Sequence, residues 1–226
     1  MDSNLEKLLQ EQKNVKVVDS SIDYMDYVAL DLSATHTDQI NLDLTNAAIF
    51  EEFIENHLSN NKTKVAFGGY LETRNLYRRS TVFKNEITDE RNIHIGLDLW
   101  IKAGTSILAA LDGKIHSFQN NTSLGDYGPT IILEHNINNI RFYTLYGHLS
   151  AESLIEKKTG QKVKKGEQIA TLGAPPINGD YAPHLHFQII KDMQDKEGDY
   201  PGVCSEKEVG FYTKNCPNPN FLLKIE

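Results

Sequence analysis

The chain has 226 residues, of which 39% are hydrophobic and 24% are charged, and its formal net charge is −8 at pH 7. This hydrophobic fraction is enough for a packed core, which excludes a disordered chain and allows one large or two small domains. The acidic excess argues against nucleic acid or an anionic lipid surface as the main partner, and no stretch approaches the roughly 20 apolar residues of a membrane-spanning helix.

Residues 1–62 are predicted to form a small α/β flanking segment. The hydrophobic spacing predicts helices over 4–12 and 47–58, and an apolar strand over 27–32. Asn60 and Asn61 are expected to end the second helix. The first ten residues lack a basic start followed by an apolar run, so the chain as given is expected to contain no secretory signal.

Residues 63–226 are predicted to form a second unit, in which short β runs alternate with glycines. Many short strands with close turns predict a mainly β fold, with an antiparallel sandwich or barrel-like core. The tail from residue 192 is expected to wrap back over this core, with residues 221–223 as an apolar anchor. The predicted strands are 65–67, 94–99, 107–110, 114–118, 130–134, 141–145, 168–172 and 185–190.

The chain contains two cysteines, Cys204 and Cys216, and both lie in this tail. Their spacing could close a disulfide but fits no zinc motif by itself. Two reduced structural cysteines are an equally good interpretation.

The spacing within two pairs of titratable residues limits where their side chains can lie. His184 and His186, at i and i+2, point to one face of a strand with Cα atoms roughly 6.6–7 Å apart, so both can address one site. In a fully extended strand, His94 and Asp98 would lie roughly 13 Å apart, so the chain must bend between them. Gly96 is at the midpoint, and its conformational freedom predicts a bulge or a strand start there.

Together with His148, these residues suit a hydrolytic metal site. Two imidazoles and one carboxylate form a ligand set for catalytic zinc with an open coordination position. The two remaining histidines suit general acid–base catalysis on a water bound there. No His-Glu-x-x-His segment occurs, so histidine must replace the helical glutamate base of other zinc peptidases. The same ligand set also suits iron or manganese.

These motifs resemble those of the M23 metallopeptidases, the lysostaphin- and LytM-like family of zinc endopeptidases. The resemblance runs from about residue 66 to residue 190 and rests on an ordered series of segments: His94-Ile95-Gly96-Leu97-Asp98, residues 104–115, Asp126-Tyr127-Gly128, Tyr146-Gly147-His148-Leu149-Ser150, residues 160–173 and Pro183-His184-Leu185-His186-Phe187. It implies that His94, Asp98 and His186 are zinc ligands. His148 and His184 then become the catalytic histidines.

The resemblance also implies a mechanism and a substrate. A zinc-activated water would attack a peptide carbonyl, and one of His148 and His184 would take the proton of the water and pass it to the leaving amine. The other would donate a hydrogen bond to the developing oxyanion, and the sequence does not decide which does which. The expected substrate is peptidoglycan, cut in stems or cross-bridges that contain glycine or D-amino acids.

Two other functions stay open. One is a non-catalytic module that binds a peptide or protein partner, although none of the five groups is missing, as would be usual for an inactive relative. The other is an intracellular peptidase with a non-wall substrate, because the chain as given has no signal; an exported protein whose signal was removed is the alternative. Residues 160–170 also resemble the hammerhead turn of biotinyl and lipoyl carrier domains, but the lysine flanked by methionine is absent.

The residues before the first expected ligand each allow two interpretations. The segment 1–62 either builds one wall of the substrate groove, which we favour, or places a side chain over the zinc as a latency plug. Tyr70, Arg74 and Tyr77 follow a pair of glycines, where a phenol or a guanidinium could reach the scissile carbonyl. The alternative is that they are ordinary loop and packing residues. The sequence predicts no oligomeric state.

Overall fold

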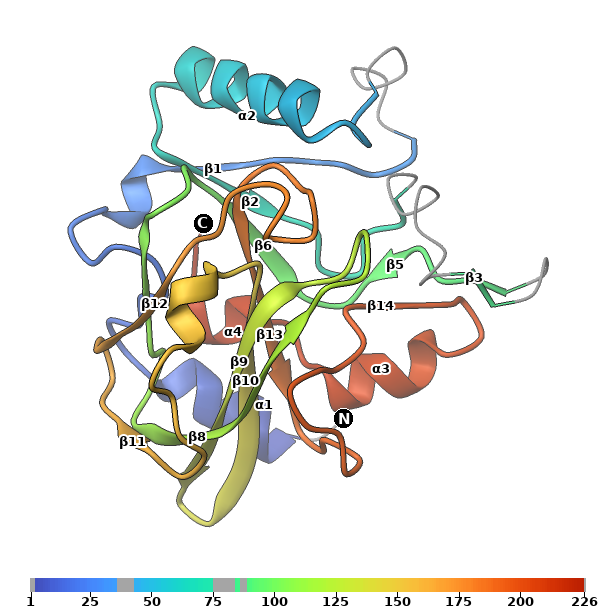
Figure 1. Ribbon diagram of the computed structural model, residues 1–226. Coiled ribbons are helices and arrows are strands. Elements are labelled where there is room, and N and C mark those ends of the chain that lie inside the picture. Colours follow the sequence, from blue (N-terminus) through green and yellow to red (C-terminus); the bar gives the residue numbers. More distant parts are fainter. Residues whose placement is uncertain (1–2, 36–42, 75–83, 86–88, 226) are drawn as a thin grey trace.

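The structure is a computed structural model that describes residues 3–35, 43–74, 84–85 and 89–225 (Figure 1). In this part of the chain, one eight-stranded sheet dominates, and it is antiparallel except for the parallel pair β1 and β2. Its strands, in spatial order, are β1 (Tyr27–Ala29), β2 (Val65–Gly68), β6 (Leu97–Trp100), β13 (His184–Ile190), β10 (Ile140–Gly147), β9 (Gly128–Ile137), β8 (Gly113–Asn121) and β11 (Lys162–Val163). The prediction of a mainly β fold is confirmed.

Three short strand pairs accompany this sheet. They are β7 (Ser106–Leu108) with β12 (Gln168–Thr171), β5 (Ile93–His94) with β14 (Val203–Cys204), and β3 (Lys84–Asn85) with β4 (Asp89–Glu90). The second pair matters for the site, because it ties the start of the His94 segment to the C-terminal part of the chain.

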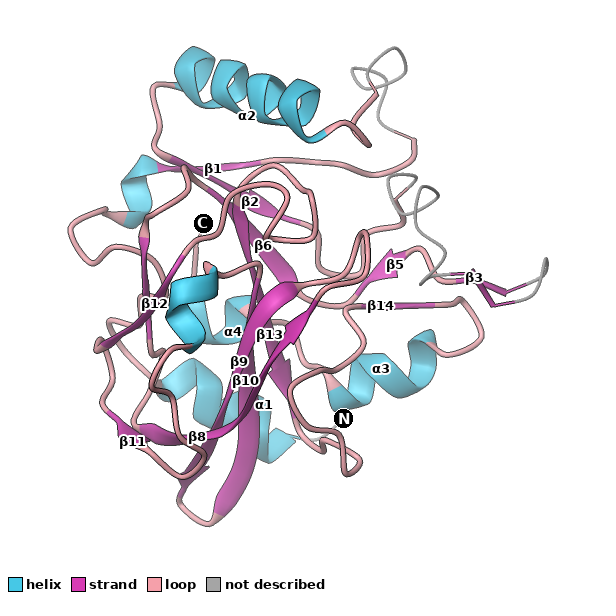
Figure 2. Cartoon of the chain, in the orientation of Figure 1, coloured by secondary structure: helices cyan, strands magenta, loops and turns pink. Residues whose placement is uncertain are grey.

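Helices cover the sheet and its edge (Figure 2). The helix α2 (Ala47–Asn61) lies over β1 and β2, and the Asn46 side chain caps it by accepting from the N–H groups of Ala48 and Ile49. The helices α1 (Ser3–Glu11) and α4 (Asn220–Leu223) pack against each other. The remaining helical elements are α3 (Val209–Asn215) and the 3₁₀ turns η1 (Tyr24–Asp26) and η4 (Ala151–Leu154). Among the described residues, no helix is long and apolar enough to cross a membrane.

Alternation along the strands divides the sheet into a core face and a functional face. On β6, Leu97 and Leu99 belong to the main hydrophobic cluster, so Asp98 and Trp100 point to the opposite face. The residues of the main cluster come from both ends of the chain as well as from the sheet. They include Leu5, Leu8 and Leu9 of α1, Leu185, Phe187 and Ile189 of β13, and Leu222, Leu223 and Ile225 of the tail.

Both ends of the chain contribute to the main hydrophobic cluster, which bears on the predictions for the tail and for the segment 1–62. The tail is anchored by Leu222 and Leu223, as expected. The segment 1–62 shares its core with the rest of the chain through α1, and the boundary between residues 62 and 63 stays a prediction. The helices α3 and α4 were not predicted, because they are short and their hydrophobic residues become a pattern only once the tail is folded against the sheet.

Candidate metal centre

The strand order brings the five predicted site residues together. β13 lies between β6 and β10, and its register places His186 opposite both Asp98 and Gly147, and His184 opposite Trp100. His148 follows directly after β10, with a left-handed backbone at φ 61°. All of these side chains are on the face of the sheet opposite the main core.

His94 reaches the same point from β5 because the chain bends at Gly96. β5 ends at His94 and β6 begins at Leu97, so the strand start predicted near Gly96 is confirmed, and the continuous strand 94–99 is wrong. A Cβ atom at Gly96 would lie 2.4 Å from Cε1 of His186. Glycine is therefore needed there for close approach of the ring as well as for the bend.

Three ligand atoms face one another at the centre of this arrangement. His94 Nε2 lies 2.9 Å from His186 Nδ1 and 3.3 Å from Asp98 Oδ1, and His186 Nδ1 lies 3.2 Å from the same carboxylate oxygen. None of the three residues is more than 3% exposed. They form a group of potential metal ligands in the described part of the chain.

The hydrogen bonds of the two histidines assign their tautomers. His94 Nδ1 lies 2.8 Å from the carbonyl oxygen of Gly69, so it must be the donor and Nε2 carries the lone pair. His186 Nε2 lies 2.9 Å from Gln188 Oε1, and this oxygen is identified because Gln188 Nε2 donates to the Pro201 carbonyl. His186 Nε2 is therefore the donor, and Nδ1 carries the lone pair.

Two lone pairs and a carboxylate oxygen thus converge in a buried space, which is unfavourable unless a cation lies between them. Burial, partly offset by Asp98, lowers the pKa of His94 to about 4, so this imidazole stays neutral near pH 7. For bonds of 2.0–2.1 Å, the ligand atoms of a tetrahedral site are about 3.3 Å apart. The observed separations fit a small divalent metal ion bound by His94, Asp98 and His186.

Arg74 fixes the carboxylate of this group. Its Nη1 donates to Asp98 Oδ2 at 2.6 Å, which leaves Oδ1 for the histidines, and its Nε donates to Glu72. Burial alone would raise the pKa of Asp98, but the His94 imidazole and the Arg74 guanidinium hold it well below its usual value. Gly69, at φ 100°, leaves the room that Arg74 needs, since a Cβ there would overlap the guanidinium.

The Nε2 atoms of His148 and His184 lie beside the centre. Each donates from Nδ1 to a backbone carbonyl, His148 to Asn178 at 2.7 Å and His184 to Ala182 at 2.8 Å, so Nε2 is left with a lone pair. Their ring centroids are 4.2 Å apart, and His184 Nε2 lies 3.9 Å from Asp98 Oδ1. Burial lowers the pKa of both histidines, so both are neutral near pH 7 and able to accept a proton.

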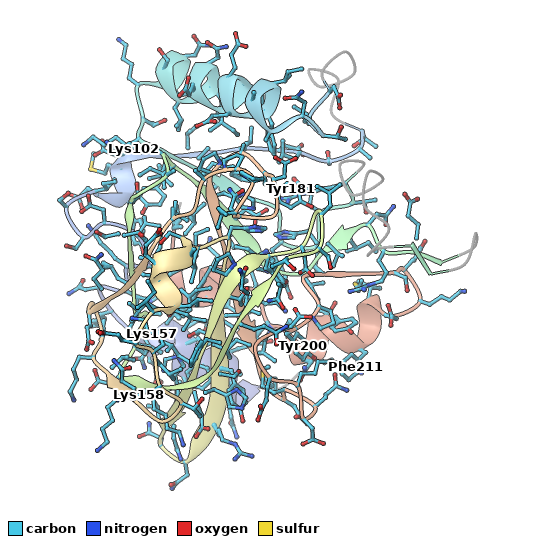
Figure 3. All side chains as sticks on the ribbon, viewed as in Figure 1. Lys102, Lys157, Lys158, Tyr181, Tyr200 and Phe211 are labelled. Atoms are coloured by element: carbon cyan, nitrogen blue, oxygen red, sulfur yellow. The ribbon has the colours of Figure 1, made fainter. Side chains whose placement is uncertain are left out.

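A cavity of about 290 Å³ opens over these groups. Aromatic side chains line much of it, including Tyr127, Trp100 and Phe50, the last of which comes from α2. Tyr181 and Tyr200, labelled in Figure 3, also line it. The cavity therefore joins a polar centre to apolar walls large enough for part of a peptide.

The residues considered for substrate positioning are placed differently. Arg74 lies in the centre, as an ion-pair partner of Asp98. The Tyr70 hydroxyl donates to the carbonyl of Cys216 and does not line the cavity. Tyr77 lies outside the described residues. Cys204 and Cys216 are free and buried, and Cys216 Sγ accepts a hydrogen bond from Gln188.

Sequence reasoning missed Gln188, although the signal was available. It is two residues after His186 on β13, so the same alternation that groups the histidines places it on their face. The side chain is fully buried, with Nε2 held by Pro201 and Cys216 and Oε1 at His186. Gln188 is the residue that sets the tautomer of His186.

Replacing Gln188 with Met should weaken metal binding by about 10- to 100-fold, because His186 loses the acceptor that orients its ring. Gln188→Glu keeps an acceptor and is the matched control, to be compared by metal titration together with thermal unfolding. Equal loss in both variants, in step with their stability, would show that Gln188 acts by packing alone.

Comparisons with known proteins relate part of this chain to a peptidase family. Residues 92–198 match the model of peptidase family M23. The chain is 34% identical over 105 residues to an uncharacterized metalloprotease of Haemophilus influenzae, a match that covers 46% of the chain and 20% of that protein. It is 32% identical over 105 residues to the peptidoglycan DD-endopeptidase ShyC of Vibrio cholerae, covering 46% of the chain and 22% of that protein. These matches span about a fifth of each curated relative.

Two solved structures are also similar to part of this chain. The catalytic domain of the antimicrobial peptidase lysostaphin from Staphylococcus simulans is 24% identical, with a TM-score of 0.41, and the match covers 68% of this chain and 94% of that one. A zinc-containing peptidase from Vibrio cholerae is 29% identical, with a TM-score of 0.35, and covers 47% of this chain and 29% of that one.

Proposed function

We propose that the protein is a zinc-dependent endopeptidase that cuts stems or cross-bridges of peptidoglycan, from the premise that residues 92–198, which match the model of peptidase family M23, are a domain of that family. The observation that carries the proposal is the convergence of two imidazole lone pairs and one carboxylate oxygen within 3.3 Å, beside two further imidazoles with free Nε2 atoms.

His94, Asp98 and His186 are the residues that would hold the metal. When bound there, zinc would supply a Lewis acid that lowers the pKa of water and polarises a peptide carbonyl. Iron and manganese also accept two nitrogens and one carboxylate, so zinc is proposed here because residues 92–198 match peptidase family M23 and the motifs resemble those of zinc endopeptidases. Arg74 keeps the Asp98 carboxylate ionised and turned toward the histidines.

His148 and His184 supply the proton chemistry in this proposal. Both rings are held by backbone acceptors at Nδ1, so each offers Nε2 to the cavity without a change of tautomer. One accepts the proton of the attacking water at Nε2 and returns it to the leaving amine. The other takes up a proton from solvent at Nε2 and donates it as a hydrogen bond to the developing oxyanion, then returns the proton to solvent. Their depressed pKa values keep at least one of them available as a base at neutral pH.

The N-terminal segment is proposed to form one wall of the substrate groove. Phe50 of α2 lines the cavity. No hydrogen bond or ion pair joins the five site residues to residues 3–35 or 43–62, the described part of this segment. This arrangement favours the wall over a latency plug, because a plug would place a polar side chain at the centre.

Peptidoglycan is proposed as the substrate because the relative ShyC is named a peptidoglycan DD-endopeptidase. The test is digestion of purified peptidoglycans, one with glycine bridges and one with direct cross-links, by the full chain, read by mass spectrometry of the released fragments. Fragments that share one cut bond would support the proposal and identify that bond. Zinc-loaded protein that releases nothing from either polymer would contradict it, and would favour a non-wall peptide substrate or a binding module.

A further inference from the structure

Trp100 occupies a place next to the catalytic groups that the mechanism above does not use. It follows Asp98 by two residues on β6, so its side chain lies on the same face of the sheet. It is paired in register with His184, and the indole and imidazole rings stack with centroids 5.8 Å apart at 28°. Trp100 is 1% exposed, yet it lines the cavity.

The indole N–H of Trp100 has no hydrogen-bond partner among the described residues. Indole nitrogen is a donor only, and a buried donor without an acceptor is costly, so native proteins rarely retain one without a reason. The neighbouring imidazoles of His94, His148 and His184 each donate from Nδ1 to a backbone carbonyl, and none of them accepts from the indole. The nitrogen itself has almost no exposed surface, so a ligand in the cavity would supply the missing acceptor only by displacing the side chains that cover the nitrogen.

The neighbours of Trp100 indicate the chemistry of this acceptor. The Phe50 ring lies 6.3 Å from the indole, and the two make an apolar wall. Arg74 Cζ lies 5.6 Å over the indole, but its charge is already matched by Asp98 and Glu72. Trp100 and Phe50 carry no charge and the Arg74 guanidinium is already paired, so this wall offers an uncharged carbonyl oxygen one donor and offers an anion no unpaired cation.

We propose that the Trp100 indole N–H binds a backbone carbonyl of the substrate peptide, in a subsite formed by Trp100 and Phe50 that accepts a small or apolar residue. The proposal rests on the endopeptidase function above. Because the indole stacks on His184, and one extended residue spans about 3.3–3.6 Å, this carbonyl belongs to a residue within about two positions of the scissile bond. Trp100 is therefore a specificity-determining residue.

Trp100 is the only tryptophan of the chain, so its fluorescence reports directly on this subsite. The binding experiment uses the full chain carrying His148→Asn, which keeps Trp100 and His184 but is expected not to turn over. The probes are acetylated, amide-capped pentaglycine and cross-linked muropeptide dimers, with the free-acid pentaglycine for comparison. We expect saturable changes in tryptophan emission with at least one neutral-ended probe, and weaker binding of the free-acid form.

The decisive variant replaces the tryptophan with its benzothienyl analogue, which keeps the shape of the ring and lacks the N–H donor. With His148 intact, KM should rise about three- to tenfold, which is the usual range for one hydrogen bond. The bound zinc and the unfolding temperature should be unchanged, because no partner inside the protein is lost. Trp100→Phe should raise KM at least as much, because it also leaves space beside Phe50.

Two results would overturn the assignment of Trp100 while leaving the peptidase function intact. One is an unchanged KM in the benzothienyl variant, and the other is a lowered unfolding temperature, which would show that the N–H has a partner in the free protein. Tighter binding of the free-acid probe would overturn the carbonyl as occupant. If the unsubstituted protein neither binds nor cuts any probe, the proposed function itself fails, and the subsite fails with it.

Discussion

Replacing His94 with Ala is expected to remove the metal and to abolish measurable turnover. The variant keeps only Asp98 and His186 of the ligand group, and the fixed lone pair of His94 Nε2, set by the hydrogen bond from Nδ1 to Gly69, is lost. Lewis-acid stabilisation is worth several kcal/mol, so the loss in kcat/KM should exceed about 10³-fold. Metal content by mass spectrometry and peptide release are measured on the same preparation.

The matched control for this prediction is His116→Ala. His116 is a half-buried histidine on β8, hydrogen-bonded to Ser117 and packed against Tyr143, away from the cavity. It should keep one equivalent of metal and full turnover. Wild-type metal content and affinity in His94→Ala would contradict the ligand assignment, whatever its activity.

Replacing His148 or His184 is expected to separate metal binding from turnover. Both residues lie beside the ligand group without belonging to it, so each variant should keep one equivalent of metal. Each should lose at least about 10²-fold in kcat, since each histidine supplies proton transfer or oxyanion stabilisation. For His184, Ala is suitable, because the residue lies in a regular strand.

His148 calls for a different substitution. Its backbone is left-handed, at φ 61°, a conformation that Asn tolerates better than Ala, so His148→Asn removes the imidazole with less strain. If the two histidines act in one transition state, the double variant should lose less than the product of the two single losses. Near wild-type kcat in both single variants would rule out this mechanism, and loss of metal from either would place that residue among the ligands.

Local spacing predicted most of the strands and grouped His184 with His186, whereas the full set of five site residues and their roles rests on the resemblance to the M23 family. The i, i+2 spacing placed His184 and His186 on one face, and the observed register then pairs His186 with Asp98. Gly96 predicted the break in the chain. The boundaries of β8, β9 and β10 extend beyond the predicted strands, because long hairpins continue where side chains alone give no signal.

What the sequence did not predict depends on contacts between distant segments. Arg74 was considered as a contact to the scissile carbonyl, yet the structure pairs it with Asp98, which is 24 residues away in the chain. The role of Gln188 depends on Pro201 and Cys216, which come from the tail. Phe50 meets Trp100 only because α2 folds over the edge of the sheet (Figure 1). No spacing rule gives these contacts.

The central claim is that this buried group of His94, Asp98 and His186 holds one zinc ion on which peptide hydrolysis depends. The most direct measurement is to remove metal with a chelator, add zinc back in steps, and follow both bound zinc and the release of peptidoglycan fragments. The account predicts no turnover without metal, a linear rise to one equivalent per chain, and no further gain beyond it. Full turnover in the metal-free protein, or turnover that does not follow zinc occupancy, would contradict it.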